Sequence, residues 1–350
     1  MGKVNLLFFK NKKVFITGHT GFKGTWLTKI LILAGARVYG YSLSPDTVPS
    51  LFKISKVEKD IISIIADIKD YKKLFGILKK IKPEIVFHLA AQPIVRESYN
   101  NPYYTYQVNV MGTINLLEAI RHISSVKSFL NITTDKVYEN SGKDYFYKED
   151  DKLCGLDPYS NSKSCSDIIT FSYGKSFLNK IAISTVRSGN VIGGGDFAKD
   201  RIIPDCYRAL VNNKPVIIRN PESIRPYQFI LDCLSGYLLL AEKQYKNKKL
   251  AGSYNFGPEK NDIIKNIELV NLFNKNLKNK FKIKIKKDNR YYEADILKLN
   301  TDKAKKVLKW HPYFDIEKSI ELTAKWYEAF IYGGDANKLM DEQILNYFKI

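Results

Sequence analysis

A tyrosine and a lysine four residues apart carry the strongest chemical signal in the sequence. Tyr159 and Lys163 follow Asp157-Pro158, and on a helix their spacing places both side chains on one face. A phenol with a pKa of ~10 is a poor base at neutral pH, but a neighbouring ammonium and a cationic cofactor stabilise the phenolate. Tyr159 can then remove a hydroxyl proton as hydride leaves the same carbon. The alternative for this spacing alone is an exposed helical pair.

A second group of reactive side chains, Thr134-Asp135-Lys136, ends an apolar run that we predict to be a strand. Ligands of open α/β sheets bind at the carboxyl ends of the strands, so we expect this group to face the cleft that holds Tyr159. Thr134 can hydrogen-bond the oxygen that Tyr159 deprotonates. A protonated Asp135 can give a proton to a departing hydroxyl, and a partly neutral Lys136 can remove a carbon-bound proton. The alternative is a turn in which a Thr-Asp pair caps a short helix.

A glycine-rich loop lies between the first predicted strand and an apolar helix. Its glycines stand at the first, fourth and seventh positions of a G-x-x-G-x-x-G pattern. Side chains at these positions would block the approach of a pyrophosphate to the backbone, and the helix N-terminus offers free N–H groups to the anion. The predicted dinucleotide-binding residues are Gly18, His19, Thr20, Gly21, Phe22, Lys23 and Gly24, with Lys23 adding a charge contact. Glycines that serve only a tight turn are the alternative.

Other cofactor contacts are less specific. The second predicted strand ends at Tyr41-Ser42, without the acidic residue that often binds the adenosine ribose in NAD enzymes and without an arginine for a 2′-phosphate. Asp67-Ile68 can contact the adenine edge, although Asp67 fits a helix N-cap equally well. Ala90-Ala91 offer small side chains that either admit a flat cofactor or serve close packing. Lys163 can also hold the cofactor ribose hydroxyls.

Alternating strands and helices must position these groups. Short β-branched runs predict strands, and longer periodic stretches predict helices, so the first half should form a doubly wound parallel sheet covered on both faces. After about residue 189 this alternation ends. We therefore expect an NAD-binding Rossmann domain over 1–188, with a segment near 228–257 returning to its sheet, and a smaller mixed α/β substrate-binding lobe mainly over 189–350. Strands are predicted over 13–17, 37–41, 63–66, 84–89, 128–133 and 181–186, and helices over 24–34, 70–80, 103–121, 159–177, 231–244 and 316–330.

Composition limits the class of protein. With 350 residues, 45% hydrophobic and 26% charged, the chain fits a globular core and not a disordered one. No apolar run approaches the ~20 residues of a membrane span, and four scattered cysteines without a C-x-x-C pair indicate reduced thiols in the cytoplasm and no zinc site. The net charge of +20 (56 basic minus 36 acidic residues) is spread along the chain. It therefore favours a solvated basic surface over a nucleic-acid face, and it can steer an anionic substrate.

Seven collinear stretches between residues 17 and 232 resemble the CDP-glucose 4,6-dehydratases, which are extended short-chain dehydrogenases/reductases. They are TGHTGFKGTWL, SLSPDTVPSLF, LAAQPIVRESYNNP, TTDKVYEN, DPYSNSKSCSD, RSGNVIGGGDFAKDRIIPD and IRNPESIRPYQFILD. Sugar-nucleotide dehydratases usually show Thr-Asp-Glu where this chain has Thr134-Asp135-Lys136. The lysine, together with Gly193-Gly194-Gly195-Asp196, is similar to the CDP-glucose branch. Tyr227 and Phe229 depart from the usual Arg-Pro-Trp-Gln-His.

The resemblance implies an NAD that is reduced and reoxidised in one turnover. Tyr159 would take the sugar O4 proton during oxidation at C4, Asp135 would protonate the departing C6 hydroxyl, and Lys136 is the candidate for the C5 proton. Hydride return to C6 would give CDP-4-keto-6-deoxyglucose, a precursor in deoxysugar biosynthesis for surface polysaccharides. A homodimer through the helices at 103–121 and 159–177 is also implied. Substrate contacts are implied for Asn190, Arg201, Arg219 and Arg225, whose guanidinium forks suit a pyrophosphate, with surface charge as the alternative.

Three other functions remain as alternatives. The nearest is a nucleotide-sugar epimerase, or a dehydratase of another nucleotide sugar, on the same fold. A non-catalytic NAD-binding sensor could lose Thr134, Tyr159 and Lys163 freely, so their presence speaks against it. A nucleic-acid binder is supported by net charge alone.

Overall fold

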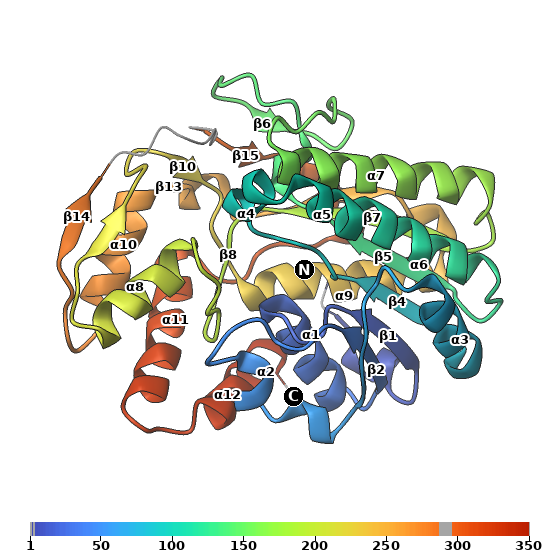
Figure 1. Ribbon diagram of the computed structural model, residues 1–350, viewed down its shortest axis with the longest axis horizontal. Coiled ribbons are helices and arrows are strands. Elements are labelled where there is room, and N and C mark those ends of the chain that lie inside the picture. The colour runs from blue at the N-terminus through green and yellow to red at the C-terminus, as the bar shows by residue number, and fades with distance from the viewer. Residues whose placement is uncertain (1, 3, 287–295, 350) are drawn as a thin grey trace.

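Seven parallel strands form the main sheet. The computed structural model describes residues 2, 4–286 and 296–349, so residues 287–295 of the expected second lobe lie outside the described residues. The strand order is β12-β7-β5-β4-β1-β2-β3, and each neighbouring pair runs parallel (Figure 1). The strands are β1 (Lys13–Thr17), β2 (Arg37–Ser42), β3 (Ile62–Ile65), β4 (Ile85–His88), β5 (Ser128–Ile132), β7 (Ala182–Ser188) and β12 (Ser253–Phe256). The order reverses between β1 and β4, which is where such sheets open a crevice for ligands.

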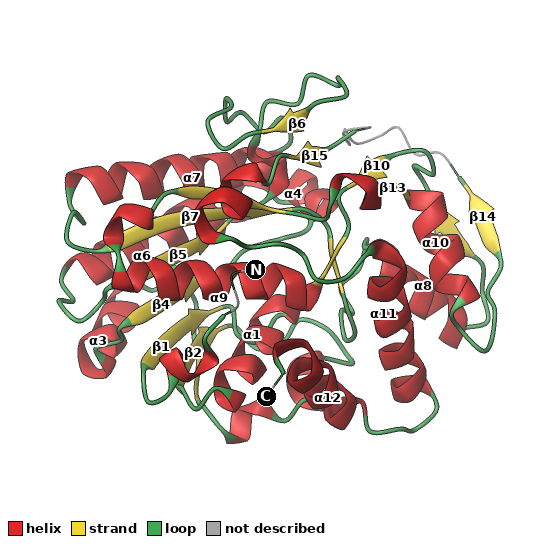
Figure 2. Cartoon of the chain, turned by 180° about the vertical axis from the view of Figure 1, so that it is seen from behind, coloured by secondary structure: helices red, strands yellow, loops and turns green. Residues whose placement is uncertain are grey.

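Helices cover both faces of this sheet, as the two opposite views show (Figures 1 and 2). On one face lie α1 (Phe22–Leu33) and α9 (Ile230–Lys246), and on the other lie α3 (Tyr71–Ile81), α6 (Gly112–Arg121) and α7 (Pro158–Ser176). Every residue of β4 and β5 is buried between these layers, which explains why both strands are mostly apolar and show no alternation with polar residues. The predicted doubly wound α/β fold is confirmed.

The helix predicted over 103–121 is interrupted. It consists of α5 (Pro102–Tyr106), a π-helical turn over Gln107–Met111, and α6. In the π turn, the buried Asn109 accepts a hydrogen bond from the backbone N–H of Gln92 at 2.8 Å and donates one to Ser162 Oγ at 2.9 Å. These contacts tie the helix pair to the loop after β4 and to α7. Helical periodicity in the sequence does not reveal such a local insertion because it depends on distant partners.

Outside the main sheet the chain forms short paired strands and further helices, most of them after β7. The strands are β8 (Val191–Ile192) with β11 (Gln228–Phe229), β9 (Val216–Ile218) with β14 (Ile283–Ile285), β10 (Ile224–Arg225) with β13 (Ile264–Lys265), and β6 (Phe146–Tyr147) with β15 (Lys298–Leu299). The helices are α2 (Leu51–Ile54), α4 (Val95–Asn100), α8 (Ile202–Val211), α10 (Asn266–Lys275), α11 (Ile316–Ile331) and α12 (Ala336–Phe348). None of the helices in the described residues is long and apolar enough to cross a membrane.

Two segments from the second half of the chain pack on the sheet. β12 adds to its edge beside β7, and α9 packs against β5 and β7, both within the region around 228–257. One hydrophobic cluster runs from Trp26 of α1 through Phe229 to Trp326 of α11, while a second lies under α3, α6 and α7. Because the first cluster is continuous across residue 188, the division into lobes at 188/189 stays a proposal.

Candidate active site

A cavity of about 310 Å³ lies beyond the carboxyl ends of β5 and β7, where α8, β9 and β10 face the sheet. Phe22 and Lys23 from the glycine-rich loop line it together with residues from both halves of the chain. Besides these two, the structure brings eight further predicted site residues to this one cavity: Thr134, Asp135, Lys136, Tyr159, Asn190, Arg201, Arg219 and Arg225. Predicted residues separated by up to 203 positions, from Phe22 to Arg225, therefore share one environment.

Tyr159 and Thr134 meet at the wall of the cavity. β5 ends at Ile132, and Thr134 is the N-cap of a 3₁₀ turn, where its hydroxyl accepts from the backbone N–H of Lys136 at 3.4 Å. The capping turn named as the alternative is therefore present, and the same side chain interacts with the phenol of Tyr159. Burial raises the pKa of Tyr159 to about 12, although the Thr134 contact opposes the rise. The phenol is thus protonated at neutral pH unless a positive charge is added nearby.

Lys163 lies beneath this pair on the same face of α7. Asp157 caps this helix by accepting from Ser160 N at 2.9 Å, and Lys163 Nζ donates to the carbonyl of Ile132 at 3.0 Å. Burial, together with the charge of Lys23, lowers the pKa of Lys163 to about 7. The pair is buried and faces the glycine-rich loop, so the predicted alternative of an exposed helical pair is wrong.

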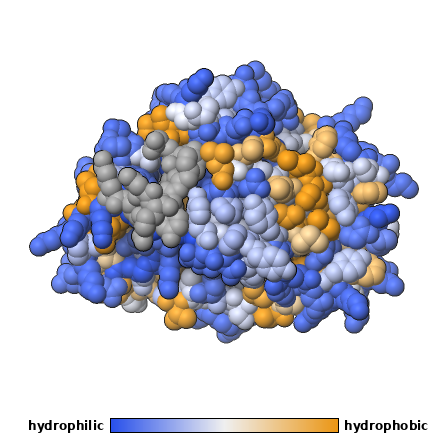
Figure 3. All heavy atoms as spheres, turned by 45° about the horizontal axis from the view of Figure 1, so that its top comes forward, coloured by the Kyte–Doolittle hydropathy of each residue, from blue (hydrophilic) through white to orange (hydrophobic). Residues whose placement is uncertain are grey.

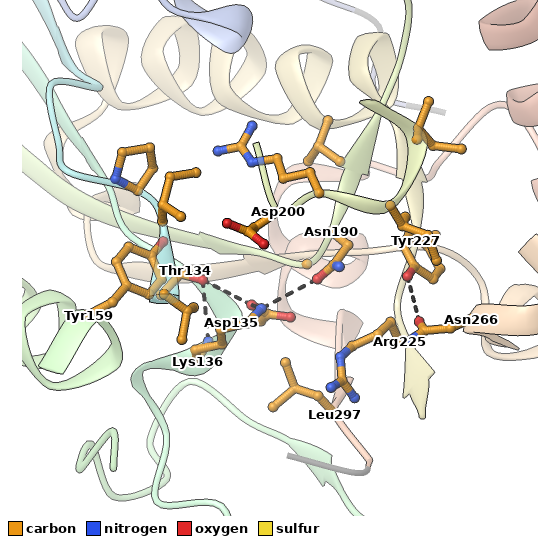
Figure 4. A pocket seen from close by; sticks show the side chains of 18 of the residues that line it. Thr134, Asp135, Lys136, Tyr159, Asn190, Asp200, Arg225, Tyr227, Asn266 and Leu297 are labelled. Atoms are coloured by element: carbon orange, nitrogen blue, oxygen red, sulfur yellow. Dashed lines mark hydrogen bonds and ion pairs between the residues drawn. The ribbon is translucent and has the colours of Figure 1, made fainter. Parts of the chain in front are cut away.

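Asp135 and Lys136 form an ion pair at the base of the cavity. Lys136 Nζ lies 3.1 Å from Asp135 Oδ1, and Thr134 Oγ donates to the same oxygen at 2.9 Å. Nζ also donates to Asn190 Oδ1 at 3.3 Å, so dashed lines join all four residues in Figure 4. The other carboxyl oxygen, Oδ2, is buried and has no hydrogen-bond partner among the described residues. An acid and a base of this type, side by side, can add and remove protons at adjacent substrate atoms.

Aspartates accompany the predicted arginines Arg201 and Arg219. Arg201 donates to Asp196 at 2.9 Å, and Arg219 donates to Asp200 at 2.8 Å. Arg225 is 6% exposed and donates to the backbone carbonyl of Ile224 at 3.0 Å. Because all three guanidinium groups line the cavity, they are not ordinary surface charges. A diphosphate entering the cavity meets a cationic wall whose charges are partly balanced by aspartates.

The glycine-rich loop is built for close approach. Gly18 has φ +77°, and a Cβ there would meet the backbone N of Ala90 at 2.7 Å, so glycine is required where β1 turns toward β4. A Cβ on Gly24 would collide with the backbone carbonyl of Gly18. Gly21, in contrast, has no atom nearer than 3.5 Å to such a Cβ, and it begins α1 without a side-chain cap among the described residues. The loop therefore leaves room and free N–H groups for an anion at the helix N-terminus.

Two side chains of this loop are used structurally. His19 contacts Ser63 Oγ at 2.7 Å, and burial lowers its pKa to about 4, so the ring is neutral. Thr20 donates to the carbonyl of Leu43 at 2.9 Å. These contacts fasten the loop to the ends of β2 and β3. Lys23 is half-buried, with Nζ 3.4 Å from Ser188 Oγ, and desolvation lowers its pKa.

The predicted adenine-side residues lie near the ends of β3 and β4. Asp67 is not a helix N-cap, because Asp70 caps α3 by accepting from Lys73 N at 3.0 Å. Asp67 instead accepts from Lys69 N at 2.9 Å and remains partly exposed, whereas Ile68 is buried against Gly112. Ala90 N donates to Thr17 Oγ at 3.2 Å, and Ala91 follows it, both partly buried. None of these four lines the cavity described above.

Sequence reasoning missed several residues of the cavity. Tyr227 donates its hydroxyl to Asn266 Oδ1 at 2.6 Å, and both line the cavity, although the sequence marks Tyr227 only as a departure from a motif. Asp196 and Asp200 also line the cavity, and the motif that contains them predicts no role for either side chain. Asn266 carries no recognisable sequence signal because it lies at the start of α10, far from every motif.

Comparisons with known proteins agree with this geometry. The sequence model of the family described as GDP-mannose 4,6 dehydratase matches residues 15–323. A CDP-glucose 4,6-dehydratase from Salmonella typhimurium is 43% identical over 353 residues, covering 97% of each chain. Among solved structures, a UDP-glucuronic acid 4-epimerase from Bacillus cereus in complex with UDP-glucuronic acid and NAD superimposes with a TM-score of 0.80 at 24% identity, covering 91% of this chain and 99% of that one.

A dTDP-glucose 4,6-dehydratase from Bacillus anthracis in complex with NAD gives a TM-score of 0.78 at 20% identity, covering 92% of this chain and 98% of that one. At such identities the structures establish a shared fold alone. The family model and the Salmonella relative, in contrast, span nearly the whole sequence. The protein therefore belongs to the GDP-mannose 4,6-dehydratase family of sugar-nucleotide dehydratases.

Proposed function

We propose that the protein is an NAD-dependent CDP-glucose 4,6-dehydratase, a hydro-lyase that yields CDP-4-keto-6-deoxyglucose. The observation that carries this proposal is the 43% identity, over 97% of both chains, with a CDP-glucose 4,6-dehydratase. The clustering of Thr134, Asp135 and Tyr159 in one cavity supports it, because the reaction needs one oxidation site beside one elimination site.

The glycine-rich loop and its neighbours suit the dinucleotide. The open space at Gly21 and the uncapped N-terminus of α1 fit a pyrophosphate, and Lys23 adds a positive charge between the loop and the cavity. Lys163 would hold the ribose hydroxyls, and Asp67-Ile68 and Ala90-Ala91 would border the adenosine. When bound there, NAD would supply the hydride acceptor for C4, the hydride donor for C6 and a positive charge beside Tyr159.

Tyr159 is the base for the sugar O4 proton in this proposal. Its phenol, with a pKa of about 12, needs cationic neighbours before it can take that proton at neutral pH. Lys163 and the cofactor provide this charge, and the Thr134 hydroxyl holds the O4 oxygen in place. The 4-ketone that results acidifies the hydrogen on C5.

Asp135 and Lys136 carry the elimination. Asp135 supplies the proton with which the C6 hydroxyl leaves as water, and Lys136 removes the C5 proton and later returns it to C5. Their ion pair places the acid and the base next to each other, as removal of the C5 proton and of the C6 hydroxyl from adjacent carbons requires. The diphosphate of the nucleotide would bind Arg201, Arg219 and Arg225, displacing aspartates from the first two.

A homodimer and a cytoplasmic location are part of the same proposal. Large apolar side chains stand exposed along α5, the π turn and α7, and Figure 3 shows hydrophobic residues gathered on that side of the molecule. The exposed large apolar side chains in this region are Tyr103, Met111, Ile168, Phe171 and Phe177. Such a concentration suits a self-complementary interface between two copies. The four cysteines are free thiols, as the reducing cytoplasm favours.

The deciding experiment is a panel of nucleotide sugars incubated with purified protein and NAD. CDP-glucose should give a 4-keto product that absorbs in alkali, and other nucleotides should react more slowly. Exclusive turnover of a different nucleotide sugar, or an epimerised product, would replace the proposal. A double Asp135→Asn and Lys136→Met variant separates the two reactions, since it should stop a dehydratase and spare an epimerase.

A further inference from the structure

The amine of Lys136 has two fixed hydrogen-bond acceptors. Asp135 Oδ1 lies 3.1 Å from Nζ, and Asn190 Oδ1 lies 3.3 Å from it. Figure 4 shows Asn190 reaching Lys136 from the opposite side to Thr134. The side chain of Lys136 is 28% exposed, so the amine is held at the cavity wall and not free in solvent.

Asn190 is well placed to fix the position of the Lys136 amine. It follows β7 and precedes β8, and its backbone carbonyl accepts from Gln228 N at 2.9 Å. That bond continues the pairing of β8 with β11. The amide is therefore carried by a paired segment, whereas Lys136 has four rotatable side-chain bonds that need external restraint.

A lysine that acts as a base must be a neutral amine with its lone pair directed at the carbon-bound hydrogen. Nitrogen in this state has four tetrahedral directions: one to its own carbon, two to N–H bonds and one to the lone pair. Two acceptors occupy both N–H bonds and leave a single direction for the lone pair. Asp135 alone would fix only one N–H bond and leave the amine free to rotate.

We propose that Asn190 is a positioning residue, which together with Asp135 aims the lone pair of Lys136 at C5 of the sugar. This inference rests on the proposed dehydration and deepens it. The resemblance described above implied that Asn190 contacts substrate, whereas the geometry assigns it to the base. A carboxylate base at position 136, as in the Thr-Asp-Glu pattern, offers no N–H bonds and would not need this acceptor.

The elimination balances with these groups. Neutral Lys136 takes the C5 proton, and the C5–H electron pair becomes the C5–C6 double bond as the C6–O bond breaks. Asp135 gives its proton to the departing oxygen, so water leaves and Asp135 becomes a carboxylate beside an ammonium. This is the ion pair that the structure shows. After hydride returns to C6, the ammonium gives its proton back to C5.

The test uses Asn190→Leu, which keeps the side-chain size and removes the acceptor. In a single turnover with NAD and CDP-glucose, oxidation at C4 should proceed and elimination should slow by roughly 10- to 100-fold, the range for losing a partner that orients a reacting group. The near-ultraviolet absorbance of the reduced nicotinamide should then persist, although it is transient in the wild type. The affinity for CDP, measured by calorimetry, should stay unchanged.

Asn190→Asp is a second variant that keeps the shape in case the leucine disturbs folding. Its carboxylate would hold Lys136 as an ammonium, so elimination should also slow. Asn140→Leu is the matched control, because Asn140 lines the same cavity but bonds Ile296 O and Gly142 N. Asn140→Leu should show the same transient absorbance of the reduced nicotinamide as the wild type.

A contact between Asn190 and substrate would produce a different pattern. In that case Asn190→Leu would weaken binding of CDP or raise KM, and no reduced nicotinamide would accumulate. That result overturns the inference. The inference is also overturned if Asn190→Leu slows elimination as much in a Lys136→Glu background as in the wild type, because no N–H bonds remain there to be oriented. Failure of the wild type to convert CDP-glucose would instead overturn the proposed function itself.

Discussion

Thr134 Oγ donates a hydrogen bond to Asp135 Oδ1 over 2.9 Å, and the same hydroxyl contacts the Tyr159 phenol. One hydroxyl thus touches both the group proposed for oxidation and the group proposed for elimination. Thr134→Val should lower kcat by about 100-fold, because an oriented hydroxyl at the reacting oxygen is lost. Thr134→Ser keeps the hydroxyl and should stay within about tenfold of the wild type. Steady-state formation of the 4-keto product measures both, and equal rates for valine and serine would contradict this role.

Tyr159→Phe should reduce turnover by roughly 10³-fold or more, since it removes the proton acceptor and leaves the ring in place. Cofactor binding should remain nearly intact because the glycine-rich loop is untouched. Turnover of CDP-glucose and titration of NAD by protein fluorescence measure the two effects. If the variant keeps its full rate, another group takes the O4 proton.

Asp200→Asn should tighten the binding of CDP by roughly two- to tenfold. Asp200 pairs with Arg219 at 2.8 Å and also lies 3.7 Å from Arg96, so its carboxylate competes with a diphosphate for the same guanidinium. The effect is modest because both partners are partly exposed. Calorimetry with CDP at two salt concentrations measures it. Glu222→Gln, which breaks an exposed pair with Lys265, is the control and should not change the affinity.

Without cofactor, stability should rise as the pH increases from about 7 toward 10. Burial lowers the pKa of Lys163 from 10.5 to about 7, so between these values the unfolded chain binds a proton that the folded chain does not. Raising the pH removes that advantage of the unfolded state. Urea unfolding midpoints across this range measure the slope. Lys163→Met should flatten it, and an unchanged slope in that variant would show that Lys163 does not titrate as described.

Asp232 anchors the C-terminal helix to α9. Its Oδ1 accepts from Tyr313 N and from the Tyr347 hydroxyl, both at 2.6 Å, and Oδ2 accepts from Phe314 N. Asp232→Ala should lower the free energy of unfolding by roughly 3 kcal/mol, because it leaves buried donors without partners. Asp315→Ala, which removes an exposed N-cap from α11, should cost only about 1 kcal/mol. Urea denaturation compares the two, and equal losses would argue against the anchoring role.

Much of the fold followed from local patterns. The short, mostly apolar runs that became β4 and β5 reflect burial on both faces of the sheet, and the spacing from Tyr159 to Lys163 reflects the helical period of 3.6 residues. The glycines at 18 and 24 are required by close backbone approach, at Gly18 to Ala90 and at Gly24 to Gly18, whereas Gly21 leaves open space. The residue that caps a helix N-terminus was harder to predict. Asp67 and Asp70 are both suitable caps, and only Asp70 serves because the helix begins one residue after it.

The sequence by itself determined the sheet, its helices and the kinds of groups available for proton transfer, because those properties arise between residues that are close along the chain. Tertiary structure decided which of those groups meet. Lys136 and Asn190 are 54 positions apart, and Asp200 and Arg219 are 19 apart. Such contacts depend on how strand ends converge at one edge of the sheet and on which loops fold over it. No local periodicity encodes that arrangement, since its energy comes from the packing of the whole chain.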